Sequence, residues 1–294
     1  MATFSQKIKA VILMTRIYTT HIYIATIISA ALLAGSFNYP NIALMCISVC
    51  SVLFLVNATN FYTDAEQDML HPMTKSENPF TNKILNKTDI IIISIFYVSI
   101  SLIAAVPLGI YWVIAVISYN IIAFAYNFKP IRMKSNPYGW FLDASLSLPL
   151  VFLFPYLILS PTLTIPNWIL VAVIMFYSTF AMIVTKDVPD MMLDKSANDF
   201  TYPNVHGIKA TRNIVIFMSL TSLICFSTLV LMNVVSIYAL PLMALLTIWI
   251  LKNVSSEDKL RDRISVYLKL NIFGIFLTPV VFLLGVIAKI FFFI

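Results

Sequence analysis

The sequence predicts an all-α protein that crosses a membrane several times. Of its 294 residues, 60% are hydrophobic and only 11% are charged, whereas about a quarter of the residues in a soluble domain are charged. The mean hydropathy is +0.92, and the apolar residues are spread from one end of the chain to the other. These observations exclude a soluble globular protein and predict one transmembrane domain over residues 1–294.

Nine apolar stretches are long enough to be membrane-spanning helices. A helix needs about 20 apolar residues to cross a hydrocarbon layer of about 30 Å. Helices are required because lipid cannot satisfy unpaired backbone groups, and no alternating pattern of a barrel strand is present. The predicted spans cover residues 11–36, 40–60, 88–106, 109–127, 141–160, 166–186, 213–233, 236–251 and 265–293. The first stretch is too long for the core of a signal peptide, so it is predicted to be a true span.

The connections between these spans alternate in charge. Short uncharged connections at 36–40, 106–110, 160–167 and 233–238 alternate with charged loops at 60–87, 129–140, 186–212 and 252–263. Apart from Lys289, all Lys and Arg residues lie in the charged loops, in the amino-terminal segment or at Lys269. The positive-inside rule therefore predicts a multi-pass integral membrane protein with its amino terminus and charged loops in the cytoplasm. The net charge of +6 is explained by this orientation, and no nucleic-acid partner is predicted.

Two of the charged loops contain aspartates with the same spacing. Asp64 and Asp68 follow one apolar span, and Asp190 and Asp194 follow another. Residues four apart share a helix face, so two carboxylates at this spacing repel each other unless a cation lies between them. Magnesium prefers oxygen ligands and commonly binds carboxylates together with substrate phosphates. The pattern therefore predicts magnesium ions that bridge to a diphosphate. The alternative interpretation is that both loops are solvated acidic loops, with ordinary carboxylates at helix starts.

Polar and basic residues beside these aspartates fit the same chemistry. Asn60 lies one turn before Asp64, where its amide would bind the metal, orient a carboxylate or cap a helix. Lys186 directly precedes the second pair of aspartates, and Arg132 and Lys134 lie in a neighbouring charged loop. These three cations are candidates for binding phosphate oxygens, with anchoring at the membrane surface as the alternative reading.

Three segments together resemble the signature loops of the UbiA-type intramembrane prenyltransferases. They are residues 60–68, the first acidic motif; residues 126–134; and residues 186–194, the second acidic motif, which is followed by Thr201, Pro203 and Gly207. The resemblance covers nearly the whole chain. It implies a bundle of nine helices around a central cavity, in which both motifs bind Mg²⁺ and a polyprenyl diphosphate.

The resemblance also implies a role for each matching residue. The metal ligands would be Asp64, Asp68, Asp190 and Asp194, supported by Asn60 and Asp187, while Lys186, Arg132 and Lys134 would bind the diphosphate and Tyr126 would lie near the reacting carbon. The Lys-Asp-x-Pro-Asp form of the second motif resembles the homogentisate, chlorophyll and geranylgeranylglyceryl-phosphate branches, and it mildly favours an aromatic, lipophilic acceptor. The sequence departs from the family pattern at Asn78, where members often have arginine, and Lys75 is the candidate replacement for that cation.

The expected reaction is ionisation of the allylic diphosphate followed by capture of the allylic cation. Metal ions and basic side chains stabilise the leaving diphosphate, and aromatic walls shield the cation from water. A terpene cyclase of the same superfamily is an alternative, in which the cation is trapped by the substrate's own double bond. A transporter is a further alternative: Pro149, Pro155 and Pro279 are able to break helices, but the acidic residues gather at one membrane face instead of forming an ion path.

Overall fold

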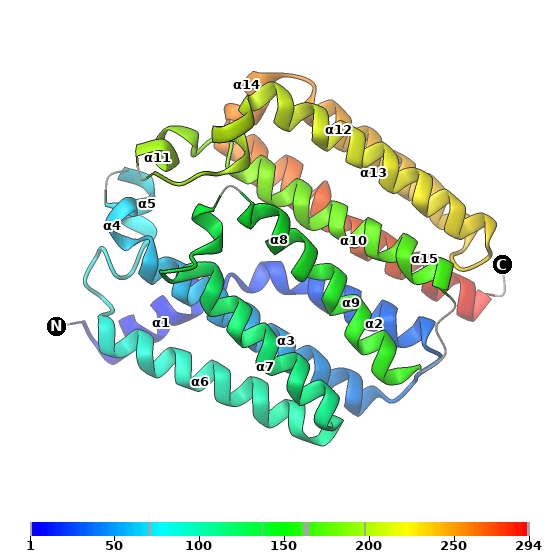
Figure 1. The fold of residues 1–294 in the computed structure, drawn as a ribbon, viewed down its shortest axis with the longest axis horizontal. Helices are drawn as coiled ribbons and strands as arrows, with labels where there is room; N and C mark the ends of the chain where they lie inside the picture. The colour runs from blue at the N-terminus through cyan, green and yellow to red at the C-terminus, as the bar shows by residue number, and fades with distance from the viewer. Residues whose placement is uncertain (1, 70–71, 137, 161–164, 197, 293–294) are drawn as a thin grey trace. The chain divides into compact units, whose positions relative to one another are not determined.

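The chain is helical throughout the residues that the computed structural model describes, which are 2–69, 72–136, 138–160, 165–196 and 198–292 (Figure 1). Within these residues no strand is present, and nine segments are long and apolar enough to cross a membrane. They are Phe4–Leu33, Tyr39–Thr63, Lys87–Leu108, Ile110–Asn127, Gly139–Leu159, Asn167–Lys186, Tyr202–Leu231, Ile237–Val254 and Ser265–Phe292. The predicted all-α membrane fold with nine spans is therefore confirmed; residue 293, the predicted end of the last span, lies outside the described residues.

The chain folds into two compact units. The first unit contains Met1–Thr20 and Tyr39–Lys134, and the second contains His21–Asn38 and Ser135–Ile294. The first acidic motif belongs to the first unit and the second acidic motif to the second unit. The expectation of one domain over residues 1–294 stays a prediction.

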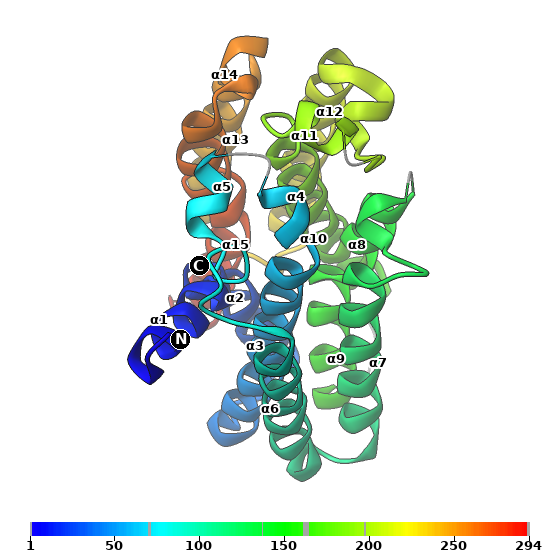
Figure 2. The same cartoon turned by 90° about the vertical axis from the view of Figure 1, so that its left-hand side faces the viewer.

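The first unit is organised around one long helix. Its helices are α1 (Phe4–Thr15), α3 (Tyr39–Thr63), α4 (Ala65–Asp68), α5 (Pro72–Glu77), α6 (Lys87–Ala105) and α7 (Ile110–Asn127), with short 3-10 turns at Ile17–Thr19 and Val106–Leu108. Helix α3 packs against α6, α7 and α1, and α1 leans away from the other three (Figure 2). Buried polar contacts join the packed helices: Trp112 Nε1 donates to Ser48 Oγ over 3.4 Å, and Asn120 Nδ2 donates to Ser101 Oγ over 3.0 Å. Such bonds satisfy polar groups that lipid would leave unpaired.

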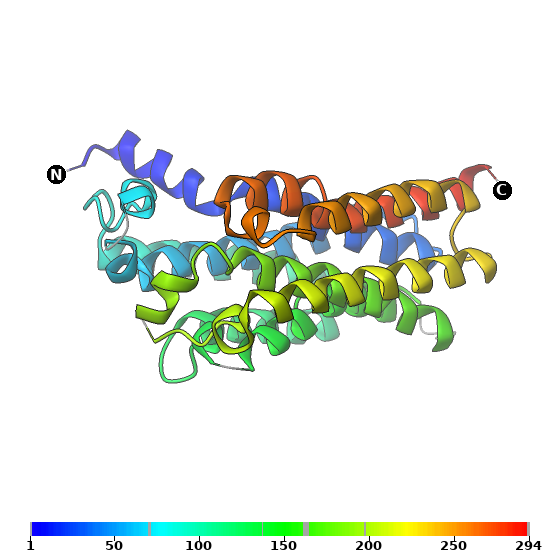
Figure 3. The ribbon, with the colours of Figure 1, turned by 90° about the horizontal axis from the view of Figure 1, so that it is seen from above.

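The second unit has α10 at its centre. Its helices are α2 (Thr20–Leu33), α8 (Gly139–Leu146), α9 (Leu148–Leu159), α10 (Ile165–Lys186), α11 (Met191–Ser196), α12 (Tyr202–Leu231), α13 (Leu240–Val254), α14 (Glu257–Arg261) and α15 (Thr278–Phe292), with a π-helical segment Ser265–Ile272 and 3-10 turns at Ile237–Ala239 and Ile275–Leu277. Helix α10 packs against α8, α9 and α12, and α12 runs beside α13 (Figure 3). Tyr177 of α10 is 2% exposed and its hydroxyl lies 2.8 Å from Ser219 Oγ of α12.

Several spans that the sequence predicts as continuous are interrupted. Arg16 has a φ of 47° and separates α1 from α2, so the helix of the first span is broken there. Ser147 has φ and ψ angles of −84° and −109° and separates α8 from α9 just before Pro149. Proline has no backbone N–H and is tolerated in the first turn of a helix, where that group would have no intrahelical partner, so Pro149 lies at the start of α9, whereas Pro155 lies inside it.

The seventh span begins earlier than predicted. Helix α12 begins at Tyr202 instead of near residue 213, and Gly207 divides it with a φ of 82° and a ψ of 165°. Only glycine adopts this backbone conformation easily. The turn from Tyr202 to His206 is therefore set at an angle to the rest of α12, directly after the second acidic motif.

Candidate active site

The first acidic motif is formed by the end of α3 and the short helix α4. Asn60 lies in the last turn of α3, and Asp64 is the residue that precedes α4. The backbone N–H of Asp68 donates to the carbonyl oxygen of Asp64 over 2.8 Å. One helical turn therefore separates the two aspartates, as their spacing predicts.

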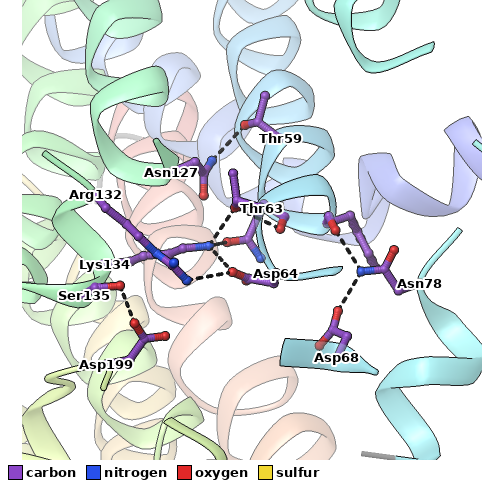
Figure 4. Close-up of polar contacts among 12 residues, drawn as sticks. Thr59, Thr63, Asp64, Asp68, Asn78, Asn127, Arg132, Lys134, Ser135 and Asp199 are labelled. Atoms are coloured by element: carbon purple, nitrogen blue, oxygen red, sulfur yellow. Dashed lines mark hydrogen bonds and ion pairs between the residues drawn. The ribbon is translucent and has the colours of Figure 1, made fainter. Parts of the chain in front are cut away.

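Lys134 lies at the centre of this motif (Figure 4). Its ammonium group donates to Asn60 Oδ1 over 2.9 Å, to Thr63 Oγ1 over 3.0 Å and to Asp64 Oδ1 over 2.5 Å. Arg132 Nη2 donates to the same oxygen of Asp64 over 3.3 Å. The structure thus brings together four of the predicted site residues, and three oxygens from one helix end converge on a single positive charge.

Asp68 has a different partner. Its Oδ2 accepts a 2.7 Å hydrogen bond from Asn78 Nδ2, which also donates to the carbonyl oxygen of Phe61 over 2.7 Å (Figure 4). Burial raises the pKa of Asp68, while the hydrogen bond from Asn78 opposes this rise. Asn78 is fully buried, so the departure from the family pattern at this position places a neutral amide against the carboxylate.

Tyr126 lies half-buried in the last turn of α7. Its neighbour Asn127 is buried, and Asn127 Nδ2 donates to Thr59 Oγ1 over 2.8 Å and to the carbonyl oxygen of Val56 over 3.0 Å. Within the described part of the chain, Asn127 Oδ1 is buried with no hydrogen-bond partner. The role of Tyr126 near the reacting carbon stays a prediction, and Asn127 is a candidate that the sequence reasoning missed. The sequence feature that could have identified Asn127 is a side-chain amide at the end of an apolar span.

The second acidic motif begins at the last residue of α10 and ends in α11. Lys186 ends α10, and the backbone N–H of Asp194 donates to the carbonyl oxygen of Asp190 over 2.9 Å. This pair of aspartates is therefore also separated by one helical turn. Asp190 accepts a 3.5 Å hydrogen bond from the Tyr267 hydroxyl, and Asp194 accepts a 3.4 Å hydrogen bond from Thr201 Oγ1.

The carboxylates of the second motif lie in an environment that disfavours their charge. Burial raises the pKa of Asp187 to about 7, and the nearby charge of Asp190 adds to the rise while Lys186 opposes it. Burial also raises the pKa of Asp194 to about 8, with further contributions from Asp187 and Asp190. Both effects follow from taking a carboxylate out of water and placing it beside others of like charge.

Further charged residues beside the second motif were missed by the sequence reasoning. Asp143 of α8 and Asp199 lie close enough to raise the pKa of Asp187, and Asp199 accepts a short hydrogen bond from Ser135 Oγ (Figure 4). Arg263 Nη1 lies 4.0 Å from Asp190 Oδ1. Asp143 carried a signal in the sequence, because it is an acidic residue inside an apolar span.

The donor chemistry of both motifs fits a hard divalent cation. In the first motif three oxygens already converge on the Lys134 ammonium group. In the second motif burial, with a smaller contribution from mutual repulsion, raises the carboxylate pKa values, and a bound cation would favour the charged forms. Among the residues described, no group of three or more His, Cys, Asp and Glu side chains is close enough to share one ion. The carboxylates therefore have the chemistry that magnesium requires, while those of Asp64, Asp68, Asp190 and Asp194 are held by protein partners.

Comparison with known families decides the class of the protein. The profile of the UbiA prenyltransferase family matches residues 22–273, which include both acidic motifs. The chain belongs to the UbiA prenyltransferase family. It is thus a prenyltransferase and an integral, multi-pass membrane protein, and the transporter alternative is set aside. No curated protein sequence matches the chain.

Solved structures confirm the fold of this UbiA family member. It is similar to a UbiA homolog from Aeropyrum pernix K1 in its apo form, with 18% identity, a TM-score of 0.75 and coverage of 93% of this chain and 98% of the other. It is similar to a UbiA homolog from Archaeoglobus fulgidus bound to GPP and Mg²⁺, with 18% identity, a TM-score of 0.72 and coverage of 96% and 99%. The chain is also similar to a structure described as a digeranylgeranylglyceryl phosphate synthase, with 19% identity, a TM-score of 0.68 and coverage of 96% of this chain and 99% of the other.

Proposed function

We propose that this UbiA family member uses magnesium to ionise a polyprenyl diphosphate and transfers the prenyl group to a lipophilic acceptor in the bilayer. The observation that carries the proposal is the convergence of Asn60, Thr63 and Asp64 on the ammonium group of Lys134. Carboxylate oxygens and a basic side chain at one helix end are the two kinds of group that a magnesium diphosphate needs. The A. fulgidus relatives bound to GPP or DMAPP together with Mg²⁺ support the same donor class.

The proposed metal ligands are Asp64 and Asp68 in the first motif and Asp190 and Asp194 in the second. Asn60 and Asp187 are proposed to orient these carboxylates. Bound magnesium supplies Lewis-acid stabilisation of the charge on the leaving diphosphate. The carboxylates of each motif lie one helical turn apart, and this spacing supports their assignment as pairs.

The proposed diphosphate ligands are Lys186, Arg132 and Lys134. Arg132 and Lys134 are already held beside Asp64 by charge-assisted hydrogen bonds, and phosphate oxygens are equally good partners for guanidinium and ammonium groups. Lys186 lies directly before Asp187 at the end of α10. These side chains would neutralise the charge that develops as the allylic C–O bond breaks.

The acceptor is proposed to be aromatic, and Tyr126 is proposed to lie near the reacting carbon. The form of the second motif, with Lys186, Asp187 and Asp190 around Pro189, resembles the homogentisate, chlorophyll and geranylgeranylglyceryl-phosphate branches and mildly favours an aromatic acceptor. The alternative is a terpene cyclase, which ionises the same donor without an external acceptor. Both alternatives use the same carboxylates, so the product distinguishes them.

Product analysis tests this proposal directly. The purified protein is incubated with labelled prenyl diphosphates of several lengths, with and without a panel of aromatic and glycerol-based acceptors, and the products are identified by mass spectrometry. We expect a prenylated acceptor that requires Mg²⁺, is lost with EDTA and returns when magnesium is restored. A cyclic hydrocarbon released without acceptor would overturn the transferase reading, and unchanged turnover in EDTA would overturn the magnesium assignment.

A further inference from the structure

Asn78 lies directly after α5 in the first unit, and its side chain is held on every polar atom. Its amide nitrogen donates to the carbonyl oxygen of Phe61 and to Oδ2 of Asp68, each over 2.7 Å (Figure 4). Its amide oxygen accepts a 2.9 Å hydrogen bond from the backbone N–H of Phe80. These bonds use both N–H groups and the oxygen of the amide, so the side chain has one defined position.

The backbone partners of the amide determine which of its ends faces Asp68. An asparagine amide has a donor end and an acceptor end of nearly the same shape, so its partners decide its orientation. A backbone N–H only donates and a backbone carbonyl only accepts. Phe80 therefore faces the amide oxygen and Phe61 faces the amide nitrogen, and the second N–H group points at the carboxylate of Asp68.

Asn78 joins two elements of the first acidic motif. Phe61 lies in the last turn of α3, where carbonyl oxygens lack partners within the helix, and Asp68 is the last residue of α4. Helix α4 has only four residues, and a single helical turn has little stability of its own. The bridge through Asn78 therefore fixes the Asp68 carboxylate relative to the end of α3, which also carries Asn60.

The amide of Asn78 orients this carboxylate without cancelling its charge. A hydrogen bond from a neutral donor favours the charged form of a carboxyl group. An arginine or lysine at this position would instead form an ion pair with Asp68 and compete with a bound cation for it. The bond from Asn78 takes only one of the about four lone-pair sites of a carboxylate, so it is compatible with a divalent ion bound to the same group.

We propose that Asn78 is a positioning residue for magnesium binding, because it holds the carboxylate of Asp68 in one orientation. The inference rests on the proposed function, in which Asp68 is a metal ligand. Asn78 does not itself contact the metal or the diphosphate, since it is 0% exposed and its amide is occupied by protein partners. Its effect reaches the metal only through Asp68, so mutation of both residues reveals the coupling.

The test measures magnesium binding by the full-length protein in detergent. MgCl₂ is titrated in the presence of geranyl diphosphate without an acceptor, and the readout is the Mg²⁺ concentration that gives half of the rise in Tm. We expect Asn78→Ala, and Asn78→Leu at similar volume, to raise this concentration at least about tenfold, as for the loss of a hydrogen bond to a charged group. In an Asp68→Asn background the same substitutions should have no further effect. The matched control is Asn82→Ala, since Asn82 Nδ2 donates to the backbone carbonyl of Ser76 in the same loop; its Mg²⁺ affinity should be unchanged.

Prenyl transfer gives a second readout. Saturating Mg²⁺ should restore most of kcat in Asn78→Ala, because the carboxylate of Asp68 is still present, whereas a damaged fold would not recover with metal. Wild-type Mg²⁺ affinity in Asn78→Ala, or equal losses of affinity in the wild-type and Asp68→Asn backgrounds, would leave Asn78 a structural role only and overturn the proposal. Wild-type affinity in Asp68→Asn alone would instead refute Asp68 as a metal ligand, so failure of the inference and failure of the proposed function are distinguishable.

Discussion

Lys134 shows how a single residue organises the first acidic motif. Its side chain is only 11% exposed, and its ammonium group has three oxygen partners at the end of α3. A buried ammonium group is stable only where such oxygens compensate for lost water. Because one of these oxygens belongs to Asp64, a proposed magnesium ligand, Lys134 holds that donor through a charge-assisted bond that a substrate phosphate is able to replace.

Removal of one carboxylate from each motif tests the metal assignment. We expect Asp64→Ala and Asp190→Ala each to lower kcat/KM by at least about 100-fold, because the charge stabilisation of the leaving diphosphate is lost. The protein should still elute as a folded species on gel filtration. The matched control is Glu66→Ala, since Glu66 is an exposed carboxylate in the same loop and should retain full activity. Wild-type turnover in either aspartate variant would refute the assignment.

The raised pKa values of Asp187 and Asp194 predict how stability depends on pH. Burial raises these pKa values from 3.8 to about 7 and about 8, so between pH 4 and 8 the folded state retains protons that the unfolded state has released. Stability without magnesium should therefore be highest below this window and should fall as the pH rises through it. The measurement is Tm in EDTA at a series of pH values.

Two comparisons complete the pH experiment. Added Mg²⁺ should raise Tm most at the alkaline end, where the carboxylates are ionised and able to bind it. Asp187→Asn removes one titrating group and should flatten the loss of Tm with pH. A Tm that rises with pH in EDTA, or an unchanged slope in the variant, would show that these carboxyl groups titrate normally.

At the scale of elements, helix ends and helix breaks position the side chains of the candidate site. Asp64 follows α3, Asp187 follows α10, and Thr201 precedes α12 and donates to Asp194. The kink at Gly207 sets the direction of the turn that follows Thr201. The helix ends and breaks therefore hold the side chains of the candidate site in place, together with the long helices.

Substitution of Gly207 tests the importance of this kink. Nothing lies within 4 Å of an added Cβ, so Gly207→Ala would act only through its backbone conformation, which a non-glycine residue adopts at a cost of about 1–3 kcal/mol. We expect a lower Tm and reduced prenyl transfer, because the turn that carries Thr201 is displaced from Asp194. Val205→Ala in the same turn changes an exposed side chain and should leave both measurements unchanged. A straightened α12 with normal activity would contradict this role.

The sequence predicts those features that depend on local pattern. The nine spans follow from runs of apolar residues, and the one-turn separation of Asp64 from Asp68 follows from helical spacing. The break at Arg16 was not predicted, because packing of neighbouring segments decides where a long apolar stretch bends, whereas Pro149 was a candidate helix breaker beside Ser147. The proximity of Asp143 to Asp187 was also missed, since it depends on how α8 packs against α10.

At the scale of the whole molecule, the distribution of charge along the chain predicts its orientation. The charged loops and the amino-terminal segment, together with Lys269 just after the last charged loop, contain 18 of the 19 Lys and Arg residues. The exception is Lys289. Lys289 lies near the end of α15, where a long side chain reaches the interface. Since basic residues are retained on the cytoplasmic side, the acidic motifs are expected there too, with access to a water-soluble diphosphate headgroup.

Cysteine accessibility tests this orientation. In a variant whose natural cysteines Cys46, Cys50 and Cys225 are replaced by alanine, a single cysteine is introduced at Asn38 in an uncharged connection or at Ser255 in a charged loop. Both positions are exposed, and a membrane-impermeant thiol reagent is applied to intact and to lysed cells. We expect Asn38→Cys to react in intact cells and Ser255→Cys to react only after lysis, because loops of unlike charge lie on opposite sides. The reverse pattern would place the acidic motifs outside the cytoplasm, and labelling of both positions in intact cells would contradict a span between the two classes of loop.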